Sequence, residues 1–326
     1  IEQLKSFDTT AAEGMVAADS RPLCVRDWFG TTAKRFADRT ACSDGERQFS
    51  YRELDEASNR LANTLINRGI KPGEPVAILL ERSMEMVVSM LAAVKAGAVY
   101  IPLDTAFPQS RIDYIVTDSK SRLLLTTSDI DCGELPVDLL KLDSDAEAIA
   151  QADATPPAVE LAENRPLYVI YTSGTTGKPK GVVVTNQNLQ RLFTATEHWF
   201  GFNEADVWTF FHSFAFDFSV WEIWGALLYG GKVVVISKEV ARSTDAFYKL
   251  ISEQQVTVLN QTPAAFKVLT EIDAGYEQPL PLALRVVVFG GEALDFESLR
   301  SWVGRYGLDK PQLINMYGIT ETTVHV

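Results

Sequence analysis

Short apolar runs alternate with amphipathic segments along most of this chain, and this alternation limits the possible folds more than any other feature. Runs such as 76–80 and 99–102 are short and uncharged, as buried parallel strands are. Between the runs, apolar residues recur every three or four positions, as in helices; segment 52–68 carries Leu54, Ala57, Leu61, Leu65 and Ile66. We therefore predict an α/β fold of two doubly wound, mostly parallel sheets flanked by helices.

The same pattern predicts how the chain is divided. Residues 1–20 are polar and rich in Ala and Thr, and we interpret them as a linker from an upstream module. Residues 21–160 form a first α/β subdomain, whose acidic, Ala- and Pro-rich end (133–166) connects to the second. Residues 161–326 form a second α/β subdomain. Its expected strands are 207–211, 232–236, 256–260, 284–289 and 312–315, and its expected helices are 186–200, 220–228, 244–254, 263–270 and 294–303.

A loop suited to polyphosphate follows the expected strand Leu167–Tyr171. Glycine and proline break any regular period over residues 172–181. The loop combines hydroxyls, glycines and cations, namely Thr172, Ser173, Gly174, Thr175, Thr176, Gly177, Lys178 and Lys180. Such a loop brings backbone N–H groups and positive charge close to phosphates. It is not a Walker A loop, because only two residues separate its first glycines and Pro179 follows Lys178. The alternative is a flexible surface turn.

Polar residues and glycines follow several expected strands of the second subdomain. They are Asp217, Asn260, Gly290, Gly291 and the segment 317–321. Ligands of doubly wound sheets bind at the carboxyl ends of the strands. The pattern therefore predicts a ligand site at one edge of this sheet.

Asp217 is the most informative single residue, since it lies between Phe216 and Phe218. Ser219 and Glu222 have the spacing of a capping box, so we expect the next helix to begin just after Asp217 without needing it as a cap. A carboxylate among aromatic rings is costly unless it has a partner. Asp217 is therefore a candidate for binding a cation; the alternative is an aspartate that only forms a turn or a cap.

Composition excludes several kinds of function. The net charge of −13 argues against binding to nucleic acid or to an anionic membrane surface. No apolar run approaches the ~18 residues of a membrane span. The three cysteines and three histidines show no metal-binding spacing. We expect free thiols in a reducing compartment, and therefore a cytoplasmic protein.

Six motifs in order resemble the adenylation domains of non-ribosomal peptide synthetases. These belong to the adenylate-forming superfamily, with acyl-CoA synthetases and luciferases. The motifs lie at Phe49–Leu54, Val94–Asp104, Thr172–Gly181, Phe216–Ser219, Phe289–Leu294 and Asn315–Thr322, and together they cover nearly the whole chain. The last motif has Ile319 where the family usually has proline.

The resemblance implies ATP-dependent activation of a carboxylate as its adenylate. It assigns the β- and γ-phosphates to loop 172–181, the α-phosphate to Thr320, and Mg²⁺, which favours carboxylate and phosphate oxygens, to Glu321. Residues near adenine would be Gly291, Glu292, Ala293, Asn315, Tyr317 and Gly318. His212 would lie beside the activated carboxylate. The alternatives are a solvated Glu321, a core Tyr317 and a structural His212.

The resemblance also assigns an amino-acid pocket. Asp217 would pair with the substrate ammonium, which favours amino acids over the acyl or aryl acids of related ligases. The other pocket positions are Phe218, Trp221, Asn260, Val288, Gly290, Met316, Val324 and His325. An apolar chamber with Asn260 and His325 as its neutral polar side chains suits L-threonine. Such a pocket should reject valine by up to ~10⁴-fold and serine by about 10–200-fold. Serine or another small amino acid is the alternative substrate.

The family also implies partners: a carrier domain whose phosphopantetheine thiol accepts the amino acid, and, from Ile319, an MbtH-like activator. Family members continue past the last motif with a β-barrel and a mobile subdomain carrying a catalytic lysine. We therefore expect these 326 residues to bind ATP and amino acid but to form adenylate slowly, with a binding-only fragment as the alternative.

Overall fold

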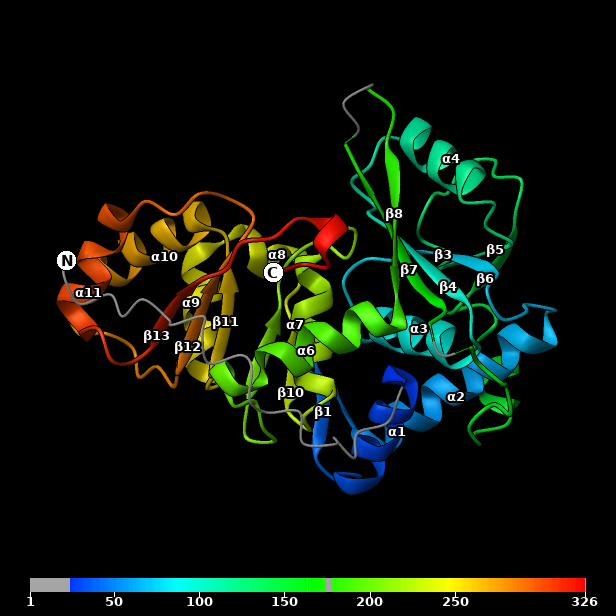
Figure 1. The fold of residues 1–326 in the computed structure, drawn as a ribbon, viewed down its shortest axis with the longest axis horizontal. Helices are drawn as coiled ribbons and strands as arrows, with labels where there is room; N and C mark the ends of the chain where they lie inside the picture. Colours follow the sequence, from blue (N-terminus) through cyan, green and yellow to red (C-terminus); the bar gives the residue numbers. More distant parts are fainter. Residues whose placement is uncertain (1–23, 163, 174–176, 326) are drawn as a thin grey trace.

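The computed structural model describes residues 24–162, 164–173 and 177–325, and the expected linker 1–20 lies outside them. Two sheets dominate the described part, side by side in Figure 1. One has the strand order β6-β5-β3-β4-β7-β8 and the other β13-β12-β11-β9-β10-β1-β2. In each, one edge pair is antiparallel and the other pairs are parallel. The predicted α/β fold of two mostly parallel sheets is confirmed.

The six-stranded sheet contains β3 (Pro75–Leu79), β4 (Val99–Leu103), β5 (Leu123–Thr126), β6 (Asp138–Lys141), β7 (Pro166–Thr172) and β8 (Lys180–Thr185). The seven-stranded sheet contains β1 (Thr40–Ser43), β2 (Gln48–Ser50), β9 (Val207–Phe210), β10 (Lys232–Val235), β11 (Val258–Gln261), β12 (Val286–Phe289) and β13 (Gln312–Asn315). The strands are not divided between the sheets at residue 160. β1 and β2 pair with the later strands, and β7 and β8 with the earlier ones.

Helices connect the strands. They are α1 (Val25–Arg35), α2 (Tyr51–Asn67), α3 (Met84–Lys95), α4 (Gln109–Asp118), α5 (Ala146–Gln151), α6 (Asn186–Phe200), α7 (Phe218–Leu227), α8 (Lys238–Arg242), α9 (Thr244–Glu253), α10 (Pro263–Gly275) and α11 (Arg300–Tyr306), with the 3₁₀ turns η2 (Phe296–Leu299) and η3 (Thr320–Thr322). The expected helix 294–303 is in fact η2 followed by α11. Strands β1 and β2 were not predicted from the sequence, because each is too short to show a clear period.

One apolar cluster joins the two sheets. It includes strand residues of both, such as Val76 and Trp208, together with residues of α3 and α7; every residue of α7, and every residue of α3 except Glu85, is buried. Helices without an exposed face belong in the interior of a protein. The two sheets therefore share one core, which holds the start of α7 against the seven-stranded sheet.

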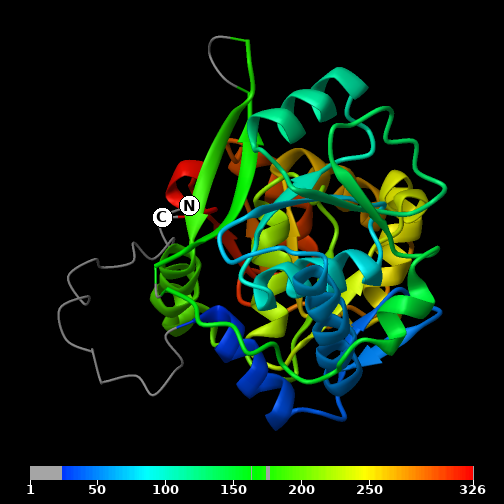
Figure 2. The ribbon, with the colours of Figure 1, turned by 90° about the vertical axis from the view of Figure 1, so that its right-hand side faces the viewer.

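Strands β7 and β8 form a hairpin at the edge of the six-stranded sheet, beside α4 (Figures 1 and 2). Helix α4 supports it: the Tyr171 hydroxyl donates to Asp118 over 2.7 Å, and the Tyr171 ring packs edge-on against Tyr114. Thr172 pairs with Lys180 and Tyr171 with Gly181. The expectation of an irregular segment over 172–181 is therefore wrong at both ends, because cross-strand hydrogen bonds extend the hairpin.

Candidate functional site

The predicted ligand residues gather at the carboxyl edge of the seven-stranded sheet. Parallel neighbours β9, β11, β12 and β13 end at the same edge. His212 follows β9, Asn260 lies near the end of β11, and Gly290 follows β12. Asn260 is directly opposite Val288 in the register, so their side chains share one face of the sheet. Asn260 and Gly290 therefore lie at one edge of the sheet as expected, and ligand binding there stays a prediction.

Asp217 is buried at the start of α7, with 5% of its surface exposed. It occupies the N-cap position, but within the described structure its side chain makes no capping hydrogen bond. Burial raises the pKa of its carboxyl group, as does the charge of Glu321. Hydrogen bonds from the Thr320 side chain and the Phe218 backbone, and the nearby His212, act in the opposite direction. A buried carboxylate whose pKa is raised gains most from a bound cation.

The expected capping box of α7 is not formed, because the helix begins at Phe218 and Ser219 lies inside it. Glu222 instead turns toward the strand end and accepts hydrogen bonds from the backbone N–H groups of Phe211 and His212, both over 3.1 Å. Its other oxygen is 2.9 Å from Nδ1 of His212. Sequence reasoning missed this role; an acidic residue inside the apolar run 218–227 was the signal that could have revealed it.

Aromatic rings enclose the rest of the predicted amino-acid pocket. The His325 ring meets Phe218 and Trp221 edge-on, with ring centres 5.3 Å apart in each case. Trp221 donates from Nε1 to Oδ1 of Asn260 over 3.0 Å. A Cβ atom on Gly290 would lie 3.2 Å from His325 and 3.3 Å from Phe218, so glycine keeps this space open. Met316, Val288 and Val324 are buried in the same core cluster.

The two polar side chains of this pocket have unused hydrogen-bonding groups. Among the described residues, Nδ2 of Asn260 and both ring nitrogens of His325 have no partner. Burial lowers the pKa of His325 to about 3, so the ring is neutral near pH 7. Unpartnered buried polar groups are rare and call for an explanation such as a ligand.

A strained backbone places His325 in this pocket. Thr323 and Val324 have φ of 67° and 65°, in the left-handed region that β-branched residues rarely adopt. The turn packs against Gly318, where a Cβ atom would lie 2.1 Å from the Val324 carbonyl oxygen. Gly318 is thus required for the approach of the chain end, a packing role that the sequence did not reveal.

The residues assigned to the nucleotide are mostly exposed. Tyr317 is 75% exposed, and Gly291, Glu292, Ala293, Asn315 and Glu321 are exposed as well. Thr320 is buried, at 9% exposure. The described residues contain no cluster of three or more His, Cys, Asp or Glu side chains that could bind a metal ion by itself. Glu321 could therefore hold Mg²⁺ only with help from other oxygens, such as those of phosphates.

The two lysines of the predicted phosphate loop lie at the start of strand β8: Lys180 is its first residue, and Lys178 comes two residues earlier. Strand β8 lies against η3, and Arg191 of α6 donates to the Thr322 carbonyl oxygen over 3.0 Å. Ser173, Gly177, Lys178 and Lys180 are exposed, and Thr172 is partly buried. The predicted residues Gly174, Thr175 and Thr176 lie outside the described residues. Strand β8 and η3 are thus neighbours, and the predicted phosphate loop leads directly into β8.

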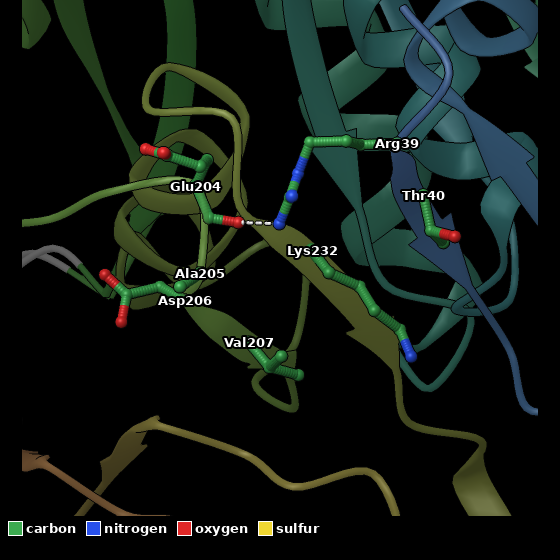
Figure 3. A pocket seen from close by; sticks show the side chains of 7 residues that line it. All are labelled: Arg39, Thr40, Glu204, Ala205, Asp206, Val207 and Lys232. Atoms are coloured by element: carbon green, nitrogen blue, oxygen red, sulfur yellow. Dashed lines mark hydrogen bonds between the residues drawn. The ribbon is translucent and has the colours of Figure 1, made fainter. Parts of the chain in front are cut away.

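A cavity of about 290 Å³ opens at the opposite end of the sheet, where β1, β9 and β10 begin (Figure 3). Three of its charged side chains already have partners: Arg39 donates to the Glu204 carbonyl oxygen, Lys232 to Gln254 over 2.8 Å, and Asp206 pairs with Arg285. It lies at the amino ends of parallel strands, away from the edge where such sheets bind ligands. We therefore place the candidate site at the carboxyl edge.

Comparisons with known proteins show the family to which the chain belongs. A family model described as "AMP-binding enzyme" matches residues 29–326. The chain is 46% identical over 316 residues to a dimodular nonribosomal peptide synthase of Bacillus subtilis, covering 93% of the chain and 13% of that protein. It is 44% identical over 324 residues to syringomycin synthase SyrB1 of Pseudomonas syringae, covering 97% and 52%. The chain thus spans about half or less of these relatives.

Solved structures show the same fold. A nonribosomal peptide synthetase, FmoA3, in its α-methyl-L-serine-AMP-bound form, aligns with a TM-score of 0.86 at 26% identity, covering 94% of this chain and 34% of that one. The N-terminal subdomain of Klebsiella oxytoca NpsA aligns with a TM-score of 0.79 at 26% identity, covering 93% and 76%. In the described ranges, no helix has the length and apolar character needed to cross a bilayer.

Proposed function

Because the chain belongs to the AMP-binding enzyme family, we propose that it is the substrate-binding core of an adenylation domain that activates an amino acid with ATP. The buried Asp217 carboxylate carries this proposal. It lies at the carboxyl edge of the sheet without a cationic side chain among its described hydrogen-bond partners, which are Thr320 and the Phe218 backbone. An α-ammonium group supplies the missing charge, and a plain acyl substrate does not.

In the proposed reaction, a carboxylate oxygen of the amino acid attacks the α-phosphorus of ATP and pyrophosphate leaves. Such transfers depend on positioning and charge neutralisation more than on covalent help from the protein. Lys178, Lys180 and the loop before them bind the β- and γ-phosphates. Thr320 contacts the α-phosphate and Glu321 holds Mg²⁺ together with phosphate oxygens.

Two features support this division of labour. Strand β8, which begins at Lys180, contacts η3, the turn containing Thr320 and Glu321. Thr320 also hydrogen-bonds to Asp217, which brings the two parts of the substrate site into contact. Adenine would then rest on exposed Tyr317, with Gly291, Glu292, Ala293 and Asn315 around it. A solved structure of FmoA3 at 27% identity is an AMPPNP-bound form, which supports nucleotide binding by this fold.

L-Threonine is the amino acid we propose. The pocket is apolar apart from Asn260 and His325, whose free nitrogen atoms could bond one hydroxyl group. Neutral His325 can either donate or accept, depending on its tautomer. The threonine methyl group would pack against Val288, Met316 or Val324. Valine offers no hydroxyl, and serine no methyl.

The same reasoning extends to partners. We propose that the adenylate is passed to the phosphopantetheine thiol of a carrier domain, since the relatives are peptide synthases. We also propose an MbtH-like activator as a partner, because Ile319 stands where the family usually has proline. We expect higher activity when the protein is co-purified with an MbtH-like protein. Full activity without it would refute the need for this partner.

Calorimetric titration with non-hydrolysable threonyl-, seryl- and valyl-adenylate analogues tests the proposal. We expect tight threonyl binding, seryl binding weaker by about 10–200-fold and very weak valyl binding. A control analogue lacking the α-amino group should bind poorly because Asp217 then has no counter-charge. Equal binding of all three aminoacyl analogues would retain the adenylate site but refute threonine. Equal binding of the control would refute the amino-acid assignment.

A further inference from the structure

Glu222 is a fully buried acidic residue beside the site, and the reaction proposed above gives it no part. Its side chain is 0% exposed and lies inside α7 among Val220, Trp221 and Ile223. Burying a carboxylate in such surroundings is costly unless hydrogen bonds and charges compensate it. What Glu222 contacts therefore indicates why it is there.

Every described contact of the Glu222 carboxylate leads to the chain around His212. One oxygen accepts from the backbone N–H groups of Phe211 and His212, both over 3.1 Å, and the other is 2.9 Å from Nδ1 of His212. Arg82, whose guanidinium lies over the Phe211 ring, adds a nearby positive charge. An ionised carboxylate can only accept, so Nδ1 must carry the proton.

This arrangement leaves Nε2 of His212 as the unused end of the ring. His212 is 7% exposed, and no described group forms a hydrogen bond with Nε2. The ring packs at 4.6 Å from the ring of Phe218 and at 5.7 Å from that of Phe216, the two residues that flank Asp217. A buried nitrogen without a partner, next to the residue expected to bind the ammonium group, points to a substrate atom as its partner.

We infer that Glu222 is a positioning residue: it holds the proton of His212 on Nδ1 and orients the ring so that Nε2, once it is also protonated, donates to the substrate carboxylate. This inference rests on the proposed function. Nε2 takes its proton from solvent, so that an N–H bond forms and an O–H bond of the solvent breaks, and the imidazolium lies between the Glu222 carboxylate and the substrate carboxylate. The charge of His212 also lowers the pKa of Asp217, so the two groups act on each other. The ammonium and the carboxylate of one amino acid would thus be recognised side by side.

The competing explanation is that Glu222 only fastens the backbone at 211–212. Glu222→Gln separates the two explanations because it keeps the shape of the side chain. The amide oxygen can still accept from both backbone N–H groups, but the amide NH₂ then faces Nδ1. Nδ1 must become an acceptor, and the proton moves to Nε2. A purely structural role is compatible with this proton shift at His212, but it predicts that substrate binding stays unaltered.

Imidazole ¹⁵N chemical shifts measure the tautomer directly. The chain has three histidines, His198, His212 and His325, so a His212→Asn variant assigns the signals. We expect the Nδ1–H pattern in the ligand-free chain, a shift toward imidazolium when L-threonine and a non-hydrolysable ATP analogue are added, and the Nε2–H pattern in Glu222→Gln. An Nε2–H pattern in the unmodified ligand-free chain would overturn the inference without any variant.

Binding provides a second readout. Glu222→Gln should weaken L-threonine affinity by about 10–100-fold, the usual effect of removing such a supporting group, while affinity for the ATP analogue stays unchanged. Asp273→Asn is the matched control: Asp273 is also buried, at 1% exposure, and accepts from Tyr248 and Tyr306 far from the site. It should change neither the His212 signals nor threonine affinity. Unaltered threonine affinity in Glu222→Gln would overturn the inference.

These results are distinguishable from failure of the proposed function. If the unmodified chain binds no amino acid, the proposed function fails, yet the ligand-free ¹⁵N pattern still reports whether Glu222 sets the tautomer. If threonine binds but the His212 signals do not respond to it, the proposed function stands and the role of Nε2 is refuted.

Discussion

At the amino end of the seven-stranded sheet Asp206 is 2% exposed, and at the carboxyl end Asp217 is 5% exposed, yet their surroundings differ. Asp206 receives two hydrogen bonds from Arg285, at 2.6 and 2.5 Å, one from Thr257 and one from the Asn203 backbone. Asp217 has Thr320, the Phe218 backbone and aromatic rings. One carboxylate is supplied with a cation by the fold, and the other is not.

The difference shows how equal burial can serve different ends. Asp206 lies just before β9, and its ion pair with Arg285 joins the start of β9 to the start of β12. At Asp217 the same kind of group remains uncompensated, which lowers stability but leaves the carboxylate available to a ligand. Substitutions at the two positions should therefore separate stability from binding.

The largest effect is expected from Asp217→Ala. Losing one partner of a buried charge pair costs about 2–5 kcal/mol, so we expect adenylate-analogue affinity to fall on the order of 10³-fold. The free energy of unfolding should change by no more than about 1 kcal/mol, because an uncompensated charge is removed. Calorimetry and urea unfolding measure the two quantities. A large loss of stability with intact affinity would show that Asp217 stabilises the fold and does not bind the ligand.

The next largest effect is expected from Asp206→Ala, which acts in the opposite way. Removing one partner of a buried ion pair leaves the other without its counter-charge, and the free energy of unfolding should fall by about 3 kcal/mol. Affinity for the adenylate analogue, measured on folded protein, should stay within about twofold. Urea unfolding with a ligand titration below the transition provides the check. Weaker ligand binding at equal folded fraction would show that the two ends are coupled.

A smaller effect is expected from His325→Phe, which keeps a flat ring between Phe218 and Trp221. The ring nitrogens, which have no described partner, are lost, so stability should not decrease. Preference for threonyl over valyl analogues should fall by about 10–100-fold, since one hydroxyl partner disappears. Competition binding with both analogues measures the ratio. An unchanged ratio would assign the hydroxyl to Asn260 alone.

The smallest effect concerns pH. Because the folded-state pKa of Asp217 is raised, the folded protein keeps the proton longer than the unfolded chain as pH rises. This residue therefore makes stability fall as pH rises between the ordinary and the raised pKa, by at most about 1.4 kcal/mol per pH unit. Asp217→Asn should remove that slope, and ammonium binding should weaken as pH falls through the raised pKa. Identical slopes in both proteins would show that Asp217 is compensated after all.

Much of the fold could be predicted from the sequence because its signals are local. The apolar runs 76–80 and 284–289 and the amphipathic segment 52–68 announce strands and helices by period alone. The pairing of β1 and β2 with β10 could not be predicted in this way, since it joins residues far apart in sequence. Nothing in a local pattern specifies which sheet a short strand enters.

For the site as well, residues with a local sequence signal could be predicted and those placed by tertiary contacts could not. Asp217, Asn260 and Gly290 were predictable because they lie at or after the ends of strands, and these ends must meet at one edge. Glu222 was misassigned to a capping box, since spacing alone cannot show whether a side chain turns to its own helix or to a neighbouring strand. The link between Thr320 and Asp217, and the role of Gly318 in admitting Val324, arise from tertiary contacts.

The exchange of strands between the two halves has a consequence for how the protein is made. During synthesis β1 and β2 leave the ribosome well before β10, the strand that β1 joins, and more than 180 residues separate the pairing partners Cys42 and Val233. The six-stranded sheet can form once β8 has emerged, whereas β1 and β2 still lack β10, the strand with which β1 pairs. Closing so long a loop is slow. Engineers who exchange segments between relatives should therefore move residues 40–50 together with 207–325, because both belong to one sheet.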